Sequence, residues 1–477
     1  MNASLPAAQA SEIGRGRTIA EIIADHAARF TYADIPEAVR EQARHVMLDA
    51  IGIAFASTAF EFAQRAYCAL GADDAATGGT VIGMAGRLPV RDAVLVNSML
   101  VHGLDFDDTY LIGGIHPTAS CFPAAFGVAE QLGSSGRDLL AAYVLGMEVV
   151  TRIAAVAQGK MNQCGLHPSS MLGGFAGAVV AGWLSHFNAH QHTMAQGIAL
   201  GMAGGTLESL EDGSWTKRIQ PGWAAASGLM AARLARQGFV GSKAAYEGRC
   251  GLFAAHMGAR VSECDFGAAT RGLGSEWTLP QVALKPYPAC HAVQAVIQAA
   301  LAIQAEHRLA AADIEAIVAV VPEYYVKLVC EPMERKRSPD SVYGAQFSLP
   351  YAAACTFVKG RFGLAEIEDA ALRDERTLSL AQRVTYRVNR NFTSEDWKTS
   401  CPAELIVTTR DGRTLSHNAR HLVGTADRPM THGEIVDKFM ANARSVMSEA
   451  RAESVRDHVL AVDGFANVKD FAALLRA

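Results

Sequence analysis

The sequence predicts a mainly α-helical protein with an α/β insertion, in which both ends of the chain build one large helical domain. Three observations lead to this prediction. Apolar residues recur at helical spacing from Ile19 to about Gly272, strand patterns alternate with helical ones to about His417, and helical spacing returns from Leu422. A chain of 477 residues also exceeds what one hydrophobic core usually supports. Residues 1–17 are predicted to form a disordered tail. Residues 18–272 and 419–477 form the helical domain, and residues 273–418 form a smaller α+β lid domain.

The composition is that of a folded enzyme-sized protein, and it gives no electrostatic reason to bind nucleic acid or a membrane. Half of the residues are hydrophobic and 19% are charged, which is typical of a globular chain and not of disorder. The formal net charge of −5 argues against a nucleic-acid partner and against an anionic membrane surface. An anionic substrate must therefore be bound by cations placed locally in its site.

Cysteine usage and the N-terminus predict a cytoplasmic protein. The nine cysteines contain no CxxC pair, a pattern that favours reduced thiols over a disulfide framework or a zinc site. Residues 1–17 lack the apolar segment of a signal peptide. The most apolar run, Met171 to Leu184, is too short to span a membrane and is expected to be a buried helix.

The N-terminal part is expected to consist of helices with few interruptions. A helix begins after Ile35-Pro36, and a short hairpin is expected at Thr80–Pro89, where two glycines permit a turn. The polar segment Glu208–Trp223 is expected to be a loop that leads into the next helix. Further helices are expected near residues 90–101, 123–131, 138–156 and 168–184.

Strand patterns enter the sequence after Gly272. A run rich in β-branched residues predicts a strand over residues 314–321, and alternating polarity predicts a second strand over residues 383–388. A hairpin is expected over residues 404–415. Helices are expected after Cys290 and near 348–358. In the C-terminal tail, Thr431 and Glu434 fit a capping box that begins a helix, and we expect this tail to return to the first domain.

One stretch collects acids, bases and a hydroxyl in the manner of an active-site wall. Within fifteen residues it holds two imidazoles, three carboxylates and a threonine, namely His102, Asp105, Asp107, Asp108, Thr109 and His116. Pro117 then suits the first position of a helix, whose unpaired N–H groups attract anions. A carboxylate that orients an imidazole produces a general base.

Two other interpretations of this stretch remain open on residue types alone. It could be a helix end followed by a solvated acidic turn, in which Asp107 and Asp108 cap a helix or pair with arginines. His102, Asp105, Asp108, His116 and His167 could also supply a mixed nitrogen and oxygen site for zinc or manganese, although no HxxxH or HExxH spacing supports this.

A second His-Pro-Ser element and two cationic segments complete the candidate site. His167 precedes Pro168 in the same way that His116 precedes Pro117, and a pocket between two helix starts would suit a di- or tricarboxylate. Lys217 and Arg218 lie in the expected loop, where two solvated charges are the simple alternative. In the segment from Lys285 to His291, two prolines fix an extended approach to a helix at the domain boundary.

The motif HGLDFDDT at 102–109, followed by HPT at 116–118, resembles the hallmark of the MmgE/PrpD family. That family includes 2-methylcitrate dehydratases, cis-aconitate decarboxylases and iminodisuccinate epimerases. The resemblance spans nearly the whole chain and implies the two-domain architecture above, a homodimer, and an enzyme without metal. It places Asp105, Thr109 and His116 at pocket positions, and Lys217 at a pocket lysine. One departure is Gln294, near a place where many relatives carry histidine.

The function predicted from these residues is a cofactor-independent lyase acting on a small di- or tricarboxylate. His116 and His291 are the predicted acid and base, positioned by Asp105 and Thr109. Lys217, Lys285 and His167 are predicted to bind the substrate. The first prediction is a hydro-lyase like 2-methylcitrate dehydratase, which removes a Cα proton. A carboxy-lyase like cis-aconitate decarboxylase and an epimerase like iminodisuccinate epimerase are the alternatives, because they need the same acid, base and cationic residues. From other classes, a metal-dependent hydrolase and a non-catalytic helical scaffold remain as alternatives.

Overall fold

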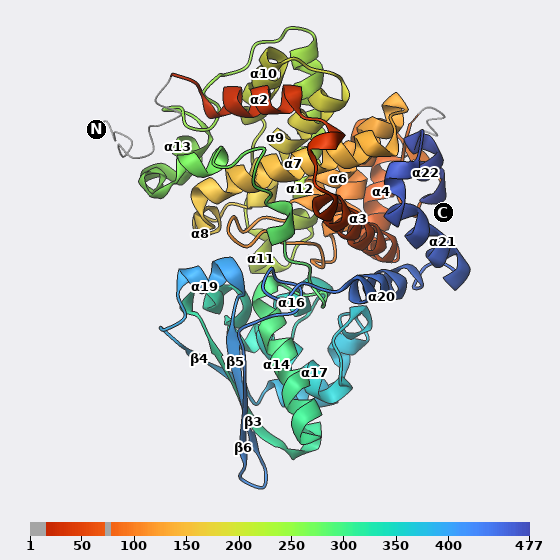
Figure 1. Cartoon of the computed structure of the whole chain (residues 1–477). Coiled ribbons are helices and arrows are strands. Elements are labelled where there is room, and N and C mark those ends of the chain that lie inside the picture. Colours follow the sequence, from red (N-terminus) through yellow and green to blue (C-terminus); the bar gives the residue numbers. More distant parts are fainter. Residues whose placement is uncertain (1–15, 72–77) are drawn as a thin grey trace.

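Two bodies of different secondary structure make up the chain, an upper one built from helices and a lower one that holds a four-stranded sheet (Figure 1). The computed structural model describes residues 16–71 and 78–477. It confirms the predicted class, mainly α with a small α/β part. The predicted disordered tail lies outside the described residues except for its last two.

The upper body contains long helices from the first half of the chain and three helices from its C-terminal end. A two-stranded hairpin, β1 (Gly79–Thr80) with β2 (Arg87–Leu88), confirms the hairpin expected at Thr80–Pro89. The helices are α2 (Ile19–Arg29), α3 (Glu37–Ser57), α4 (Glu61–Leu70), α5 (Val90–His102), α6 (Thr118–Leu132), α7 (Gly136–Ala157), α8 (Lys160–Gln163), α9 (Pro168–Leu184), α10 (Ala189–Leu200), α11 (Ser209–Asp212), α12 (Thr216–Arg236), α13 (Leu252–Met257), α20 (His432–Ala443), α21 (Glu449–Leu460) and α22 (Val468–Leu474).

The lower body packs helices against a mixed sheet of order β4-β3-β5-β6. The pair β3/β4 is parallel, whereas β3/β5 and β5/β6 are antiparallel. Burial alternates along β5, so one face of the sheet points toward the helices. Its elements are α14 (His291–His307), β3 (Ile314–Val321), α15 (Met333–Arg337), α16 (Val342–Gln346), α17 (Leu349–Lys359), α18 (Glu375–Ala381), β4 (Val384–Val388), α19 (Ser394–Thr399), β5 (Ala403–Thr409) and β6 (Thr414–Ala419).

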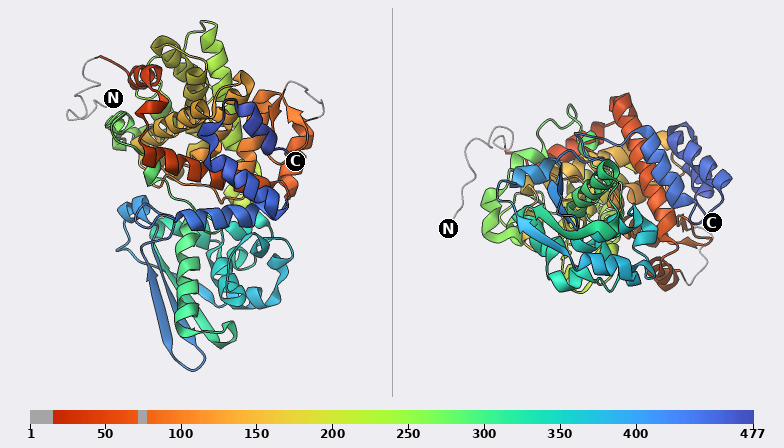
Figure 2. Two further views of the ribbon diagram at one scale, coloured as in Figure 1. Left: turned by 45° about the vertical axis from the view of Figure 1, so that its right-hand side comes forward. Right: turned by 90° about the horizontal axis from the view of Figure 1, so that it is seen from below.

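Each body has its own hydrophobic core. The first core gathers buried side chains from Ile19 to Leu284 and again from Ile435 to Leu475. The second gathers side chains from Ala283 to Leu422, together with Leu111. The C-terminal tail therefore returns to the helical body, where α20 packs on α3 (Figure 2). The exact domain boundaries stay a prediction.

Close contact between α9 and α12 holds the centre of the helical body. Nearly every residue of α9 is buried, and glycines line its contact with α12. A Cβ at Gly228 would lie 2.3 Å from the backbone oxygen of Gly174, so only glycine permits this approach. The apolar run that composition marks as a buried helix is thus the central helix of the fold.

Several element boundaries follow from local signals, one predicted helix begins earlier than expected, and one predicted loop was wrong. The capping box at Thr431 and Glu434 is present at the start of α20. The helix expected near residues 123–131 begins at Thr118 and keeps Pro123 inside it, because packing on α9 outweighs the missing hydrogen bond. The loop expected at Glu208–Trp223 contains α11 and the first two turns of α12.

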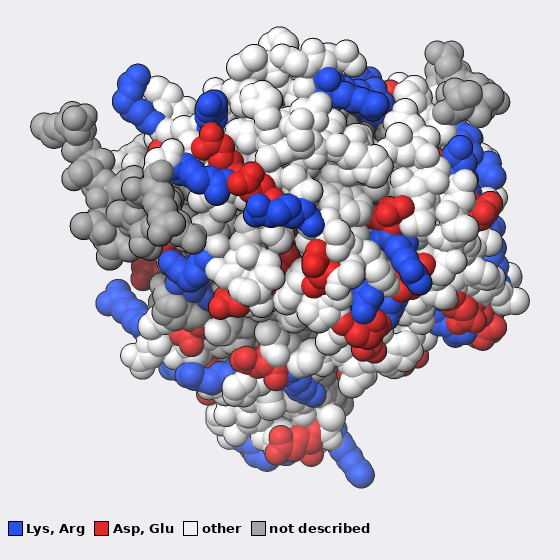
Figure 3. Space-filling model, turned by 45° about the horizontal axis from the view of Figure 1, so that its top comes forward, with Lys and Arg blue, Asp and Glu red and all other residues white. Residues whose placement is uncertain are grey.

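Within residues 16–71 and 78–477, one helix, α7, is long and apolar enough to cross a membrane, but 94% of its apolar window is buried inside the protein. The bent pair α3 and α4 passes the same test only if counted as one span. Such burial is typical of a core helix. On the face drawn in Figure 3, lysine and arginine alternate with aspartate and glutamate, without a large area of one sign.

Candidate active site

The loop between α5 and α6 folds back on itself and presents the polar residues of the motif. Tyr110 pairs with Ile115 across a turn in which Gly114 has φ of 61°. Thr109 exchanges two backbone hydrogen bonds of 2.8 Å with Ala283, which draws the segment before Lys285 against the loop. The loop thus joins two parts of the chain that are far apart in sequence.

Asp105 has a left-handed backbone with φ of 48°, a conformation that costs energy for a residue other than glycine. Lys217 donates to its Oδ1 at 2.8 Å, while the Lys285 ammonium lies 2.7 Å from its backbone oxygen and 3.3 Å from its Oδ2. All three side chains are buried. Burial would raise the pKa of Asp105, but the two lysines outweigh burial and hold that pKa well below its ordinary value.

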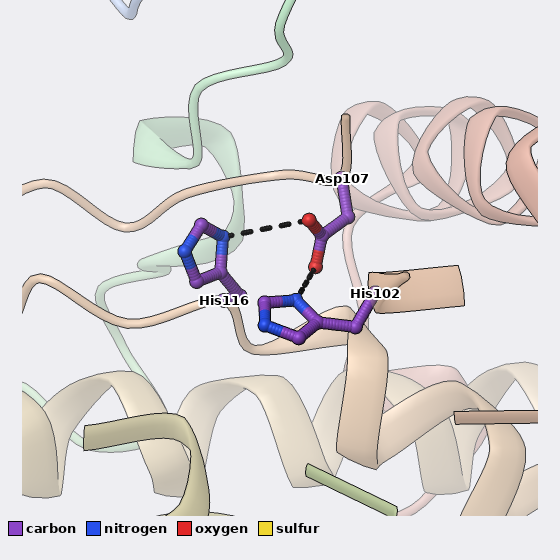
Figure 4. A group of neighbouring side chains, drawn as sticks. All are labelled: His102, Asp107 and His116. Carbon is purple, nitrogen blue, oxygen red and sulfur yellow. Dashed lines mark hydrogen bonds and ion pairs between the residues drawn. The ribbon is translucent and has the colours of Figure 1, made fainter. Parts of the chain in front are cut away.

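Asp107 lies between two imidazoles, as Figure 4 shows. His102 Nδ1 donates to Asp107 Oδ2 at 2.8 Å, and His116 Nδ1 lies 3.6 Å from Oδ1. The ring centroids of His102 and His116 are 4.8 Å apart, and those of His102 and His167 are 5.5 Å apart. Burial raises the pKa of Asp107, and His116 lowers it in part.

His116 is oriented as a base. Its Nδ1 donates to the backbone oxygen of Asp108 at 2.9 Å, which leaves the lone pair of the neutral ring on Nε2. Its backbone N–H donates to Ser169 at 3.0 Å, so the starts of α6 and α9 are linked. Thr109 Oγ1 lies 3.4 Å from Nδ1. Burial holds the pKa of His116 well below its ordinary value, which favours the neutral form.

His167 and His291 supply two more neutral imidazoles. His167 Nδ1 donates to Gln220 at 2.7 Å. Neither ring nitrogen of His291, nor Nε2 of His167, has a hydrogen-bond partner within the described part of the chain. Burial lowers the pKa of His291 to about 3, and it holds that of His167 well below the ordinary value.

A cavity of about 540 Å³ opens onto these groups, a size suited to a small-molecule ligand. Four helices of eight or more residues begin at it: α6 behind His116, α9 behind His167, α12 at Lys217 and α14 at His291. Their N-terminal N–H groups and dipoles favour an anion. The opposite wall comes from the lower body, through residues such as Lys336, Tyr343 and Phe347.

Family comparisons match both halves of the chain. The MmgE/PrpD N-terminal domain matches residues 21–264, and the MmgE/PrpD C-terminal domain matches residues 287–463. The chain belongs to the MmgE/PrpD family. The resemblance of the HGLDFDDT and HPT motifs is thereby confirmed.

Curated relatives within this family are named as decarboxylases. A cis-aconitate decarboxylase-like protein of Aspergillus oryzae is 27% identical over 462 residues, covering 93% of this chain and 94% of its own length. The cis-aconitate decarboxylase of Aspergillus terreus is 26% identical, covering 93% of this chain and 92% of its own. That of Mus musculus is 26% identical, covering 93% and 89%. These relatives are lyases, and they support a lyase-type function in this MmgE/PrpD chain.

All seven residues that the sequence singles out as site residues lie together in this MmgE/PrpD chain. Asp105, Thr109, His116, His167, Lys217 and His291 line the cavity. Lys285 lies directly behind Asp105. Gln294 points away from the histidines, since it donates to the backbone oxygens of Tyr287 and Ala289.

The expected contacts of Asp105 and the setting of Lys217 need correction. Asp105 binds two lysines, and Asp107 takes the place beside His116 that the sequence assigns to Asp105. Lys217 is buried in the first turn of α12, and so is Arg218, which packs over the ring of Phe62 at 4.4 Å. The simple alternative of two solvated charges is wrong.

The site also contains residues that sequence reasoning passed over. Asp107 could have been noticed from its five-residue spacing to His102, but nothing in the sequence ranks it above Asp105. Neither Asp107 nor Asp108 forms an ion pair with an arginine in the described structure, and both are buried, so the solvated acidic turn is wrong.

His102, Asp107 and His116 offer ligand atoms within 4.8 Å of one another and could hold a metal ion. This trio differs from the set considered from the sequence, since it omits Asp105, Asp108 and His167. Two of these atoms, His102 Nδ1 and Asp107 Oδ2, share the hydrogen bond drawn in Figure 4, and His116 Nδ1 donates to the backbone oxygen of Asp108.

Proposed function

We propose that this protein is a lyase that acts on a small di- or tricarboxylate without a metal ion or organic cofactor. The observation that supports it most is the buried cluster in which one carboxylate, Asp105, faces two ammonium groups, Lys217 and Lys285. Around Asp105 the ammonium groups therefore outnumber the carboxylate that they bind, next to neutral imidazoles. A bound carboxylate would supply the missing negative charge.

Decarboxylation of a compound like cis-aconitate is the reaction that we place first. The names of the curated relatives, which match along 93% of this chain, favour it over the hydro-lyase that the sequence places first. In this reaction the bond to one carboxylate breaks and carbon dioxide leaves. The electron pair stays on the substrate, delocalised into its double bond, until a protonated histidine donates a proton to carbon.

The histidines can serve as this proton source although their pKa values are lowered in the free site. A bound polycarboxylate brings negative charge next to His116 and His291, and nearby negative charge raises the pKa of an imidazole. Substrate binding thus favours the protonated form at the moment when a proton is needed. Lys217 holds the carboxylate that stays on the product, and Lys285 adds its positive charge from behind Asp105.

Dehydration of a compound like 2-methylcitrate is the second candidate. The position of His116 favours dehydration. Its Nδ1–H donates to the backbone oxygen of Asp108 and its ring is neutral, so the free lone pair on Nε2 is suited to removing a Cα proton. The lysines would then stabilise the charge that develops on the adjacent carboxylate. Water would leave from the neighbouring carbon with a proton from a second histidine.

Proton NMR in deuterated buffer distinguishes these reactions directly. Purified protein, treated with chelator, is incubated with cis-aconitate, 2-methylcitrate, citrate or iminodisuccinate. Loss of a carboxylate from cis-aconitate with one deuterium in the product supports decarboxylation, loss of water from 2-methylcitrate supports dehydration, and deuterium exchange alone indicates an epimerase. Lys217→Met should abolish whichever signal appears. No change with any compound, and hydrolysis of an ester only after metal addition, would overturn the lyase proposal.

We also propose that the protein forms a homodimer in a reducing compartment such as the cytoplasm. Apolar side chains are exposed along α12 and at the residue before it, namely Trp215, Ile219, Trp223, Met230 and Leu234, and a second copy would cover them. All nine cysteines are free thiols. Light scattering coupled to size-exclusion chromatography should give a dimer for the wild type and a monomer for Trp223→Glu; a wild-type monomer refutes the homodimer.

A further inference from the structure

The basic run Arg335-Lys336-Arg337 sends its three side chains to different places. Arg335 donates to the backbone oxygens of Glu211 and Asp212, and Arg337 donates to that of Val384. Lys336, at the end of α15, turns into the wall of the active-site cavity. The sequence gives these residues no function, and the proposed reaction has not used them.

The ammonium group of Lys336 is held in place but not neutralised. It donates to the backbone oxygens of Leu328 at 2.9 Å and Phe347 at 2.8 Å. No carboxylate within the described ranges forms an ion pair with it. An ammonium group has three N–H donors, so one donor remains for a ligand in the cavity. Burial lowers the pKa of Lys336 to about 8, so the group is still mainly charged at neutral pH.

Lys336 faces the lysine cluster of Asp105 across the same cavity. Asp105, Lys217, Cys290 at the start of α14 and Lys336 all line this cavity. Lys217 belongs to the wall formed by the helical body, with Lys285 behind it on Asp105, whereas Lys336 is in α15 of the lower body. A ligand in the cavity thus meets cationic groups on both sides.

We propose that Lys336 is the binding site for a second carboxylate of the substrate, so that the cavity selects compounds with carboxylates at both ends. This inference rests on the proposed function and deepens it, since it names the residue of the lower body that discriminates substrates. A charged hydrogen bond in a partly dry site is strong, and its loss should weaken binding about 10- to 100-fold. A compound with a single carboxylate gains nothing from Lys336.

The charge of Lys336 also sets a pH dependence. The groups that face it are Arg335 beside it, Glu211 of α11, and the thiols of Cys290 and Cys330, both raised in pKa by burial and therefore neutral below pH 8. As the pH rises through about 8, Lys336 loses its proton. Affinity for a dicarboxylate should then fall, whereas affinity for a monocarboxylate should not follow this change.

Calorimetric titration with glutarate and glutaramate tests the inference. Both have the five-carbon backbone of citrate and cis-aconitate, but glutaramate carries a neutral amide in place of one carboxylate. Lys336→Gln removes the charge and keeps two N–H donors, on a side chain one bond shorter, for the carbonyls of Leu328 and Phe347. Lys336→Arg keeps the charge. Lys327→Gln is the matched control, because Lys327 lines the same cavity but is exposed.

The expected result is a preference of the wild type for glutarate over glutaramate that Lys336→Gln removes, with glutarate affinity falling about 10- to 100-fold. Lys336→Arg should retain the preference, and Lys327→Gln should bind like the wild type. Equal glutarate binding by wild type and a folded Lys336→Gln, with an unchanged thermal transition, overturns the inference and leaves the polycarboxylate site standing. Failure of the wild type to bind either compound overturns the polycarboxylate site itself and this inference with it.

Discussion

Replacing Asp107 by asparagine should disable the enzyme although the residue is outside the predicted set. The carboxylate accepts the Nδ1–H of His102 at 2.8 Å and lies 3.6 Å from Nδ1 of His116. An asparagine of the same shape offers one acceptor and one donor, so at least one of the two imidazoles faces the amide with the wrong tautomer or swings away. The positive charge that develops on His116 during proton transfer also loses its nearest negative charge.

The size of the effect follows from the geometry. An opposite charge within 4–6 Å shifts a pKa by about 1–3 units, which corresponds to about 1.4–4 kcal/mol. If this whole amount stabilises the imidazolium of His116 in the transition state, its loss lowers kcat about 10- to 1000-fold. KM should change little, since Asp107 is not among the residues that line the cavity.

The assay is steady-state turnover of whichever polycarboxylate the NMR experiment identifies, with Asp108→Asn as the matched control. Burial and the neighbouring Asp107 hold the pKa of Asp108 well above its ordinary value, so its side chain is kept toward the neutral acid and asparagine resembles it. We therefore expect a near-normal kcat for Asp108→Asn. Equal kcat values for Asp107→Asn and the wild type would refute the idea that this carboxylate supports His116.

Three further predictions follow from the buried charges. Lys438→Met leaves Asp49, its partner at 2.6 Å, buried without a counter-charge. The free energy of unfolding measured by urea titration should fall by about 3–5 kcal/mol. The same urea midpoint and slope for the variant and the wild type would contradict this. The pKa values of His116 and His291 are lowered in the folded protein. Below pH 6.5 the unfolded chain therefore binds more protons than the folded one. The midpoint of thermal unfolding should fall as the pH drops below that value. Treatment with EDTA should leave the lyase activity intact, and loss that zinc or manganese restores would support a metal at His102, Asp107 and His116 instead.

The helix starts of the site could be predicted because their signals are local. A proline in the first turn favours a helix start wherever the rest of the chain lies, and α9 begins at Pro168 as expected. Local signals also predict, wrongly, a loop around Lys217. Gly213 before it, and Pro221 with Gly222 after it, weaken the helical pattern, but α12 forms because it packs closely on α9 and α5.

The partner of each carboxylate could not be predicted, because it depends on contacts between distant segments. Asp105 and Asp107 differ by two positions and have the same chemistry. What separates them is the left-handed backbone at Asp105 and the pairing of Thr109 with Ala283, which bring Lys285 to one carboxylate and leave the other between histidines. The role of Lys336 likewise depends on where α15 meets the cavity.

The loop that holds Asp105 is fixed by lysines from three distant parts of the chain. Lys217 and Lys285 bind Asp105 itself, and Lys438 of the C-terminal α20 donates to the backbone oxygen of the next residue, Phe106, at 3.0 Å. Lys438 is in turn held by Asp49 of α3. A backbone strained at Asp105 keeps its shape only if its surroundings determine it more strongly than its own preference does. The return of the C-terminal tail therefore does more than close the first core: it supplies one of the three cations that hold the candidate active-site loop in place.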